Sequence, residues 1–327
     1  MKTAIVTGGA GFIGSYMVDK LLKEDYFVRV LDNFSGGHKK NLKHINSKNL
    51  EVINKDITLI NSNNNIFKNV DVIFHFAGLG DVVPSIEKPL DYLNVNVQGT
   101  VNILNAAKLN NIENFIYAAS SSCYGIADVP TTEEHPINPQ YPYALSKYMG
   151  ELSVMHWRKV YKLNCKSIRI FNAYGRRVRT TGAYGAVFGV FFKQKLEKKP
   201  LTIVGDGKQK RDFLHVRDVV DAFYEVYVTD TKDCIFNVGA GNPQSVLELV
   251  KLIDSNFKFI PKRPGEPDVT WADISKIISQ TKWLPKIDFK KGVEDMMNNI
   301  EDWKDAPLWN EENISKATEI WFKYLGK

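Results

Sequence analysis

A phenol and an ammonium group lie four residues apart in the segment YALSK, which contains Tyr143 and Lys147. Pro142 directly precedes them, and proline suits the first turn of a helix, where residues i and i+4 share one face. Both side chains can therefore enter one cleft. A free phenol titrates near pH ~10, so a tyrosine acting as a base at neutral pH needs a nearby cation, which the lysine supplies. Taken alone, the same spacing also fits an ordinary amphipathic helix.

A nucleotide-binding loop upstream favours the chemical interpretation, and one is predicted at the start of the chain. In the segment TGGAGFIG, Gly8, Gly11 and Gly14 follow a short apolar run and open a segment of helical periodicity. Glycine at this spacing lets the backbone approach a pyrophosphate, which then lies on the amide groups of the helix N-terminus. A glycine-rich turn without a ligand is the alternative interpretation.

The end of the next apolar run carries a carboxylate. Asp32 stands eighteen residues beyond Gly14. A carboxylate at this place can bind both ribose hydroxyls and repel a 2′-phosphate, which favours NAD over NADP. Lys39 and Lys40 follow closely and leave NADP open, and a solvated acid in a turn is the plainer alternative.

Three consecutive serines stand before a tyrosine and a glycine in AASSSCYG, residues 118–125, and this stretch contains no carboxylate. Hydroxyl groups can orient or relay the proton of an alcohol. A hydroxyl with an ordinary high pKa cannot abstract a carbon-bound proton and then protonate a leaving group. At a reactive centre, this stretch therefore supports alcohol oxidation and disfavours elimination.

The elements that must position these residues alternate in type through the first half of the chain. Short β-branched runs are followed by segments of helical periodicity. This alternation predicts a Rossmann doubly wound α/β fold, with a parallel sheet covered by helices on both faces. We expect strands at 4–7, 27–31, 51–53, 70–74 and 114–118, and helices at 13–23 and 99–109.

The pattern loosens after about residue 170. We expect an NAD-binding domain over 1–170, to which some later segments return, and a smaller α/β substrate lobe with a C-terminal helical extension over 171–327. Helices are expected at 213–228 and 245–256, and a short strand at 235–238. In the extension, apolar side chains recur at helical spacing, which predicts a helix docked on the body rather than a partner motif. These side chains are Ile314, Ala317, Ile320, Trp321 and Tyr324.

Composition narrows the class of protein. The chain has 327 residues, 44% of them hydrophobic, enough for a full globular core. No stretch reaches the roughly 18 apolar residues of a spanning helix, so we expect a cytoplasmic protein without a membrane segment. Three scattered cysteines and six histidines without HxxxH spacing predict neither a disulfide framework nor a metal site. The net charge is +6, but the basic residues are interleaved with acidic ones along the chain. We therefore expect a small anionic ligand and no nucleic acid.

Together these motifs resemble the extended short-chain dehydrogenases/reductases, in particular the nucleotide-sugar epimerase and dehydratase group and its UDP-glucose 4-epimerase-like branch. The resemblance covers nearly the whole chain. It is carried by TGGAGFIG, DNFSGG, DVIFHFAG, NVNVQGT, SSSCYG, YALSK, RIFNAYG, GDGKQKRDFLHVRDVV, FNVGAGNPQSVLELV and RPGEPDVTWAD. It implies NAD-dependent epimerisation at C4 of a nucleotide-diphosphate sugar through a 4-keto intermediate.

The resemblance also implies roles for individual residues. Ser120, Tyr143 and Lys147 would be catalytic. The substrate would contact Ser121, Ser122, Asn172, Arg211 and Arg263, of which the last three would hold its nucleotide diphosphate. NAD would contact Gly8, Gly11, Phe12, Ile13, Gly14, Asp32, Asn33, Ser35, Asp56, Ile57, Phe76, Ala77, Gly78 and Asn96, together with Tyr143 and Lys147. A serine that satisfies strand-end backbone groups and an arginine in a surface ion pair are the plainer alternatives.

Three further expectations follow from the resemblance. Relatives that eliminate water carry a glutamate at the position of Ser122, so a 4,6-dehydratase is disfavoured. A C4 dehydrogenase or reductase with the same catalytic set, or a non-catalytic NAD- or RNA-binding scaffold, stays an alternative. Thr270 replaces a bulkier aromatic residue that restricts the C2 substituent of the sugar, so an N-acetylhexosamine is expected to fit. The helices at 99–109 and 142–161 correspond to a family dimer interface, which predicts a homodimer.

Overall fold

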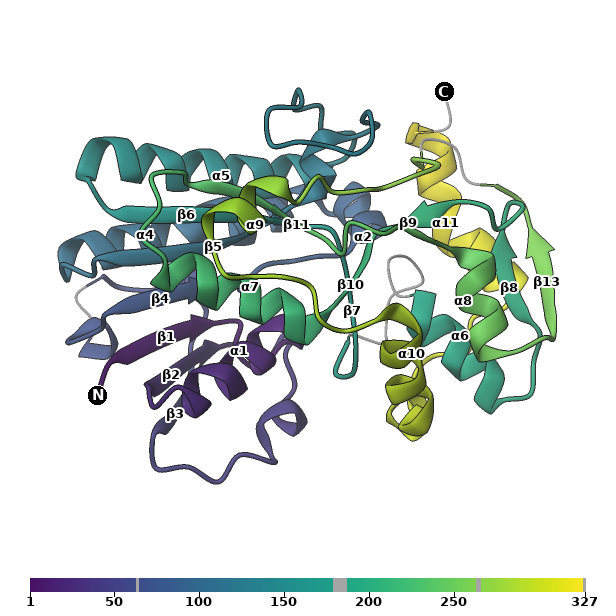
Figure 1. Ribbon diagram of the computed structural model, residues 1–327. Helices are drawn as coiled ribbons and strands as arrows, with labels where there is room; N and C mark the ends of the chain where they lie inside the picture. Colours follow the sequence, from purple (N-terminus) through teal and green to yellow (C-terminus); the bar gives the residue numbers. More distant parts are fainter. Residues whose placement is uncertain (63–64, 179–186, 263–265, 326–327) are drawn as a thin grey trace.

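A computed structural model describes residues 1–62, 65–178, 187–262 and 266–325. Its main body is a seven-stranded sheet in the order β3-β2-β1-β4-β5-β6-β11, with every neighbouring pair parallel (Figure 1). The first six strands have the order of dinucleotide-binding domains. The predicted doubly wound fold is confirmed.

The strands of this sheet are short, and the inner ones are rich in buried apolar residues, as strands covered on both faces require, whereas the edge strand β3 is largely exposed. They are β1 (Thr3–Thr7), β2 (Phe27–Asp32), β3 (Leu50–Asn54), β4 (Val72–His75), β5 (Asn114–Ser120), β6 (Asn164–Ile170) and β11 (Ile235–Val238). The helices that connect and cover them are α1 (Phe12–Lys23), α2 (Val82–Glu87), α3 (Pro89–Leu93), the π-helical η4 (Asn94–Gly99), α4 (Thr100–Leu109), α5 (Pro142–Tyr161), α7 (Val216–Val228) and α9 (Ser275–Gln280). Short 3₁₀ turns are η1 (Lys39–Leu42), η2 (Ile57–Leu59), η3 (Asn65–Phe67) and η5 (Ser121–Tyr124).

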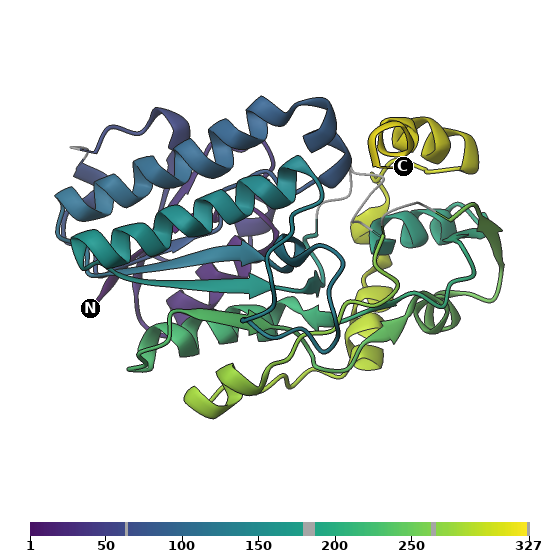
Figure 2. The same ribbon diagram turned by 90° about the horizontal axis from the view of Figure 1, so that it is seen from above.

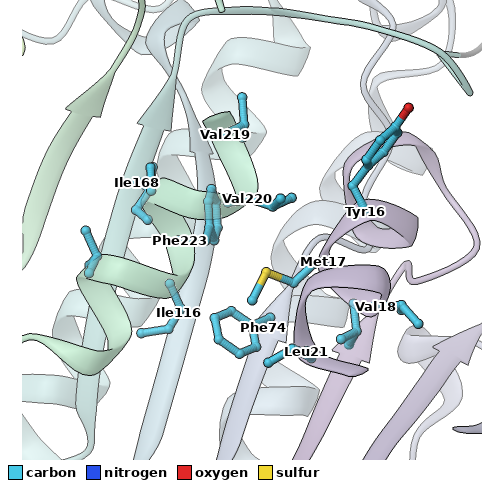
Figure 3. Packing of buried hydrophobic residues seen from close by; sticks show 14 of the residues in the cluster. Tyr16, Met17, Val18, Leu21, Phe74, Ile116, Ile168, Val219, Val220 and Phe223 are labelled. Carbon is cyan, nitrogen blue, oxygen red and sulfur yellow. The ribbon is translucent and has the colours of Figure 1, made fainter. Parts of the chain in front are cut away.

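Two hydrophobic clusters hold these helices to the sheet. On one face, Met17 and Leu21 of α1 pack with Phe223 of α7 against Phe74 of β4 (Figure 3). On the other face, α4 and α5 lie side by side and bury residues such as Ile103 (Figure 2). Burial of one such side chain stabilises the fold by about 1.5–3 kcal/mol. The carboxyl ends of the strands therefore form one rigid edge.

A smaller lobe follows the sheet in the chain and has its own core, built from α6, α8 and α10 with the strand pair β8–β13. Its elements are β7 (Asn172–Tyr174), α6 (Val187–Leu196), β8 (Leu201–Val204), β9 (Lys210–Arg211), β10 (Phe213–His215), β12 (Gln244–Ser245), α8 (Val246–Ile253), β13 (Phe257–Ile260), α10 (Phe289–Asn298), η6 (Ile300–Trp303) and α11 (Glu311–Leu325). The boundary near residue 170 stays a prediction.

The prediction of a helix over 213–228 is wrong for its first three residues. Residues Phe213–His215 form β10, which pairs in parallel with β7, and the helix begins only at Val216. His215 ends the strand and caps the helix, because its Nδ1 accepts a hydrogen bond from the amide of Arg217 at 3.3 Å. Periodicity alone does not reveal this boundary, since both elements are apolar on the buried side.

The strand β6, which lies between β5 and β11, was not predicted because its sequence NCKSIRI carries two basic residues. Both are buried with partners. Lys166 Nζ donates to the carbonyls of Val226 and Thr229 at 2.6 and 2.7 Å, and Arg169 pairs with Glu151 at 2.6 Å. Buried charges need such partners, which no local sequence pattern shows. Within the described ranges, no helix combines the length and apolar character needed to cross a membrane.

Candidate active site

The turn between β1 and α1 forms a cradle that only glycine allows. Gly8 has a φ of +67°, and a Cβ added there would lie 2.7 Å from the amide nitrogen of Ala77. A Cβ on Gly14 would lie 2.2 Å from the carbonyl oxygen of Gly8. Gly11 caps α1, and Phe12 and Ile13 form its first turn. The cradle thus leaves the helix N-terminus open to an anionic group.

Asp32 joins this cradle to the end of β2. Its carboxylate accepts hydrogen bonds from the amides of Ala10, at 2.9 Å, and Phe34, at 2.8 Å. Asp32 is only 6% exposed, and a Cβ on Gly37 would lie 2.7 Å from its Oδ2. The neighbouring loop is therefore folded tightly over the carboxylate, whose remaining lone pairs can accept further donors.

The loops after β2 and β3 meet beside Asp32. Asn33 donates from Nδ2 to Asp56 at 2.8 Å, and the hydroxyl of Ser35 donates to Asn33 Oδ1 at 2.7 Å. Partial burial raises the pKa of Asp56, but hydrogen bonds from Thr58 and Asn33 outweigh it and lower the pKa overall. Ile57 is buried directly beneath, 5% exposed. The structure thus brings these four predicted residues to one place.

The loop after β4 is held by an amide clamp. Asn96 Oδ1 accepts from the amide of Leu79 at 2.7 Å, and its Nδ2 donates to the Leu79 carbonyl at 3.0 Å and to Ser146 Oγ at 2.9 Å. This buried side chain therefore positions Phe76–Leu79 against α5. Ala77 lies against Gly8 of the cradle, whereas a Cβ on Gly78 would lie 2.9 Å from Asn96 Oδ1 and 3.8 Å from Lys147 Nζ.

His75 lies behind this loop, and sequence reasoning missed it. Its ring is fully buried between the hydroxyls of Thr7, at 2.8 Å from Nδ1, and Thr100, at 3.0 Å from Nε2. Burial, reinforced by the charge of Lys147, lowers the pKa of His75 to about 3. The ring stays neutral and ties β1, β4 and α4 together. The segment HFAG contained this residue, but nothing marked it as a bridge.

Tyr143 and Lys147 lie on one face of α5, as their spacing predicts. Burial raises the pKa of Tyr143 above its ordinary value, and the neighbouring Ser120 hydroxyl only partly offsets this effect. Lys147 is 7% exposed, with Nζ 4.4 Å from the ring centroid of Tyr117, and burial lowers its pKa to about 7. The phenol therefore lies beside a hydroxyl and one helical turn from a buried amine, the groups needed to move an alcohol proton.

The serine stretch turns at the end of β5. Ser120 Oγ lies 2.8 Å from Ser122 Oγ and accepts a hydrogen bond from the amide of Ser122 at 3.2 Å. Ser121 begins the 3₁₀ turn that follows and is half-buried. Ser120 thus satisfies a backbone group at the strand end, which is the structural role considered above as an alternative. It also lies close to Tyr143.

Residues expected to hold the substrate lie in the second lobe. Asn172 Oδ1 accepts a hydrogen bond from the hydroxyl of Thr270 at 2.7 Å. Arg211 donates from Nη1 to the carbonyl of Pro267 at 2.9 Å and lies 3.6 Å from Glu266. These contacts within the second lobe orient the guanidinium of Arg211. Arg263 lies outside the described residues.

Comparison with known proteins agrees with this geometry. The model of the NAD dependent epimerase/dehydratase family matches residues 4–239. The chain belongs to this family. A putative UDP-glucose 4-epimerase of Methanocaldococcus jannaschii is 38% identical over 90% of this chain and 97% of its own length. The resemblance stated from the motifs is confirmed.

Two solved structures of the family are similar over nearly their whole length. One is a UDP-N-acetylglucosamine 4-epimerase from Methanobrevibacter ruminantium in complex with UDP-N-acetylmuramic acid, with a TM-score of 0.86, 31% identity and coverage of 93% of this chain and 98% of that one. The other is a UDP-glucuronic acid 4-epimerase from Bacillus cereus in complex with UDP-glucuronic acid and NAD, with a TM-score of 0.83, 30% identity and coverage of 91% and 99%.

The glycine cradle fits the cofactor after which the family is named. The close approach of Gly8 and Gly14 to neighbouring backbone leaves room for a pyrophosphate but for no side chain. Asp32, at the adjacent strand end, presents a carboxylate to the ribose side. These features belong to the dinucleotide site that we predict for this family member.

Replacing Lys147 with methionine is expected to stabilise the fold while lowering activity. Burial lowers the pKa of this lysine to about 7, whereas an unfolded lysine keeps its proton up to about pH 10. The unfolded state therefore binds more protons between these values, and the wild-type protein gains stability as pH rises through that window. K147M lacks the burial cost, so its melting temperature should exceed that of the wild type by several degrees at pH ~7.

This advantage should shrink as the pH approaches ~10, and epimerisation should fall by about 10²-fold or more at every pH. Thermal melting of both proteins across this pH range measures the first effect. An advantage that instead grows toward high pH would show that the ammonium is not the group responsible.

Proposed function

We propose that this protein catalyses NAD-dependent epimerisation at C4 of a nucleotide-diphosphate sugar, a UDP-hexose or a related sugar. The observation that carries the proposal is the cluster of Ser120, Tyr143 and Lys147 beside the glycine cradle at the carboxyl edge of the sheet. The similar proteins named above are 4-epimerases of UDP-sugars, which supports the choice of UDP.

In this proposal, each residue of the cluster has one task. Tyr143 takes the proton of the sugar 4-hydroxyl and later returns it, and Ser120 orients that hydroxyl. Lys147 supplies positive charge that stabilises the phenolate. The glycine cradle would hold NAD, which would supply a reversible hydride acceptor for C4. Asn172 and Arg211, with Arg263, hold the nucleotide diphosphate while the keto sugar turns, so that the two hydride transfers occur on opposite faces.

The absence of an acid at Ser122 supports epimerisation rather than dehydration. This position carries a hydroxyl that is hydrogen bonded to Ser120, not a carboxyl group. A serine hydroxyl cannot take a carbon-bound proton at neutral pH. The sequence SSSCYG therefore leaves the elimination of water without its base.

The proposal is tested by incubating the purified protein with UDP-glucose, UDP-N-acetylglucosamine and UDP-glucuronic acid, without added cofactor, and following the products by NMR. We expect one of these sugars to reach an equilibrium with its C4 epimer. Formation of a free keto product with stoichiometric reduction of nicotinamide would instead identify a dehydrogenase. No change in any nucleotide sugar, with or without added NAD, would contradict the proposal.

We further propose that the site accepts a sugar with an enlarged C2 substituent, because Thr270 is small. Its hydroxyl holds Asn172 at 2.7 Å, so its side chain is directed toward the substrate lobe. T270Y is expected to lower kcat/KM for UDP-N-acetylglucosamine by about 10-fold or more relative to UDP-glucose, since one pocket contact discriminates by about 1–3 kcal/mol. T270S, which keeps the hydroxyl, is the control. Equal losses for both sugars would contradict this role.

We also propose a homodimer built on α4 and α5. Leu145, Met149 and Leu152 form a stripe along α5 and are 43%, 36% and 50% exposed. Apolar stripes of this kind are typical of helical interfaces. The double variant L145E/L152E is expected to elute as a monomer in size-exclusion chromatography with light scattering, because an apolar interface does not accommodate unpaired charges.

The matched control is L284E, because Leu284 is 52% exposed but follows α9, away from α4 and α5. We expect it to leave the oligomeric state unchanged. A monomeric wild-type protein, or a dimer that survives both substitutions on α5, would overturn the proposed interface.

A further inference from the structure

The C-terminal helix reaches the proposed active site from the far end of the chain. α11 packs against α2, and Trp321 is buried there, 1% exposed, with Val82 and Val83 (Figure 2). Tyr141 and Tyr143 pack against the same cluster. A helix that follows the whole substrate lobe therefore lies against the segment that carries the proposed base.

Three aromatic rings form a row that ends at this base. The Trp321 and Tyr141 centroids are 5.8 Å apart at an interplanar angle of 45°, and Tyr141 stacks on Tyr143 at 6.3 Å and 7°. Tyr143 also meets the ring of Tyr92 in a T-shaped contact at 6.4 Å. Stacked rings resist rotation and sliding of their neighbours. The orientation of Tyr143 therefore depends on Tyr141, and that of Tyr141 depends on Trp321.

The serine hydroxyls lie beside the same two tyrosines. Ser120 Oγ lies 2.8 Å from Ser122 Oγ. Ser120 is close enough to Tyr143, and Ser122 close enough to Tyr141, to lower the pKa of each phenol against the larger effect of burial. The paired serines therefore border both phenols.

Tyr141 also lies close to residues of the second lobe. Burial raises the pKa of its phenol, Tyr143 and Glu266 raise it further, and the charge of Arg211 lowers it. Tyr141 is therefore near both the proposed base and the arginine that we assign to the diphosphate.

We propose that Tyr141 and Trp321 form an aromatic wall that positions Tyr143 and confines the sugar, so that α11 is part of the active site. The inference rests on the proposed epimerase function. In that reaction the keto sugar has to turn without leaving, and a firm wall at its side keeps it within reach of the cofactor. Both are positioning residues, since Trp321 acts through Tyr141 and Tyr141 through Tyr143.

The test uses W321L, which keeps a buried apolar side chain and so preserves the docking of α11, but lacks the ring. We expect it to fold and to retain NAD, with a melting temperature several degrees below that of the wild type because the smaller side chain leaves a cavity. Its kcat should fall about tenfold or more, with a KM change below about threefold, because a small misplacement of a reacting group can cost up to about 10²-fold. W321F, which retains a ring, should recover most of the loss.

A second measurement, the release of keto sugar, tests the confinement of the sugar directly. Each keto sugar that escapes has given a hydride to the cofactor and a proton to Tyr143, so it leaves one equivalent of reduced nicotinamide on the protein. W321L should release several-fold more keto sugar per epimerisation, trapped with borodeuteride and counted by mass spectrometry. Y141F, which keeps the stack, should show less release than W321L.

Y324A is the matched control, because Tyr324 lies on the same helix but is 58% exposed. It should leave kcat and release unchanged. A folded W321L with wild-type kcat and wild-type release would overturn the aromatic wall while the epimerase proposal stands. A wild-type protein without epimerase activity would refute the proposed function itself.

Discussion

Replacing Tyr143 with phenylalanine should lower kcat for epimerisation by about 10³-fold or more, since proton transfer by a positioned side chain contributes about 10²–10⁴-fold. The phenol lies beside the Ser120 hydroxyl and one helical turn from the buried Lys147. Neither neighbour replaces it in the proposed mechanism, because the serine is too weak a base and Lys147 has the separate task of stabilising the phenolate.

Phenylalanine keeps the ring contacts that hold this part of α5. Tyr143 stacks with Tyr141 and meets Tyr92 edge-on, and both contacts use the ring rather than the hydroxyl. Y143F should therefore fold with a melting temperature within a few degrees of the wild type and retain its NAD. Initial rates, bound-nucleotide content after denaturation and thermal melting measure the three quantities.

Tyr148 provides the control for this experiment, because it lies on the same helix and is half-buried against another cluster. Y148F should leave kcat within about twofold. Substantial activity in Y143F, or an equal loss in Y148F, would remove Tyr143 from the role of base.

Replacing Gly14 with alanine should abolish retention of NAD. The added Cβ would lie 2.2 Å from the carbonyl oxygen of Gly8 and 2.9 Å from the Cα of Gly9, so the turn has to open. Overpacking of this kind costs about 1–3 kcal/mol of stability, and the displaced helix N-terminus loses its approach to a pyrophosphate. We expect the affinity for NAD to fall by about 10²-fold or more, since 1.4 kcal/mol corresponds to a factor of ten.

Gly36 offers a matched glycine outside the cradle, because a Cβ there would meet no atom within 4 Å. G36A should bind NAD as the wild type does, which isothermal titration with protein stripped of nucleotide can measure. The outcome that contradicts the cradle is a folded G14A with unchanged affinity for NAD. Loss of affinity in both variants would point to the loop as a whole instead.

Local sequence patterns were enough to predict several strands of the sheet and the glycine turn proposed to bind the cofactor. The runs at 4–7, 27–31 and 114–118 are strands in the structure, and the glycines lie where β1 turns into α1. These features are readable because a strand, a turn and a helix each impose a short-range pattern on apolar and glycine residues. The spacing of Tyr143 and Lys147 belongs to the same class, since one helix presents both.

Features that depend on distant partners were not readable in this way. The strand β6 was hidden by Lys166 and Arg169, whose charges find partners on α7 and α5 only after folding. His75 gave no sign that it would bridge two threonines from separate elements. Only the tertiary structure decides such contacts, because they join residues far apart in the sequence.

What the amino-acid sequence determined by itself is the chemistry available to this protein: a glycine turn for a dinucleotide, a phenol beside an amine, and hydroxyls in place of an acid. The tertiary structure decided how that chemistry is held. It buried Lys147 enough to shift its pKa and clamped the loop after β4 through Asn96. It also brought Trp321 to the side of Tyr141. The physical reason is that residue type and local period are encoded along the chain, whereas burial and long-range contact arise only when distant segments of the chain pack together.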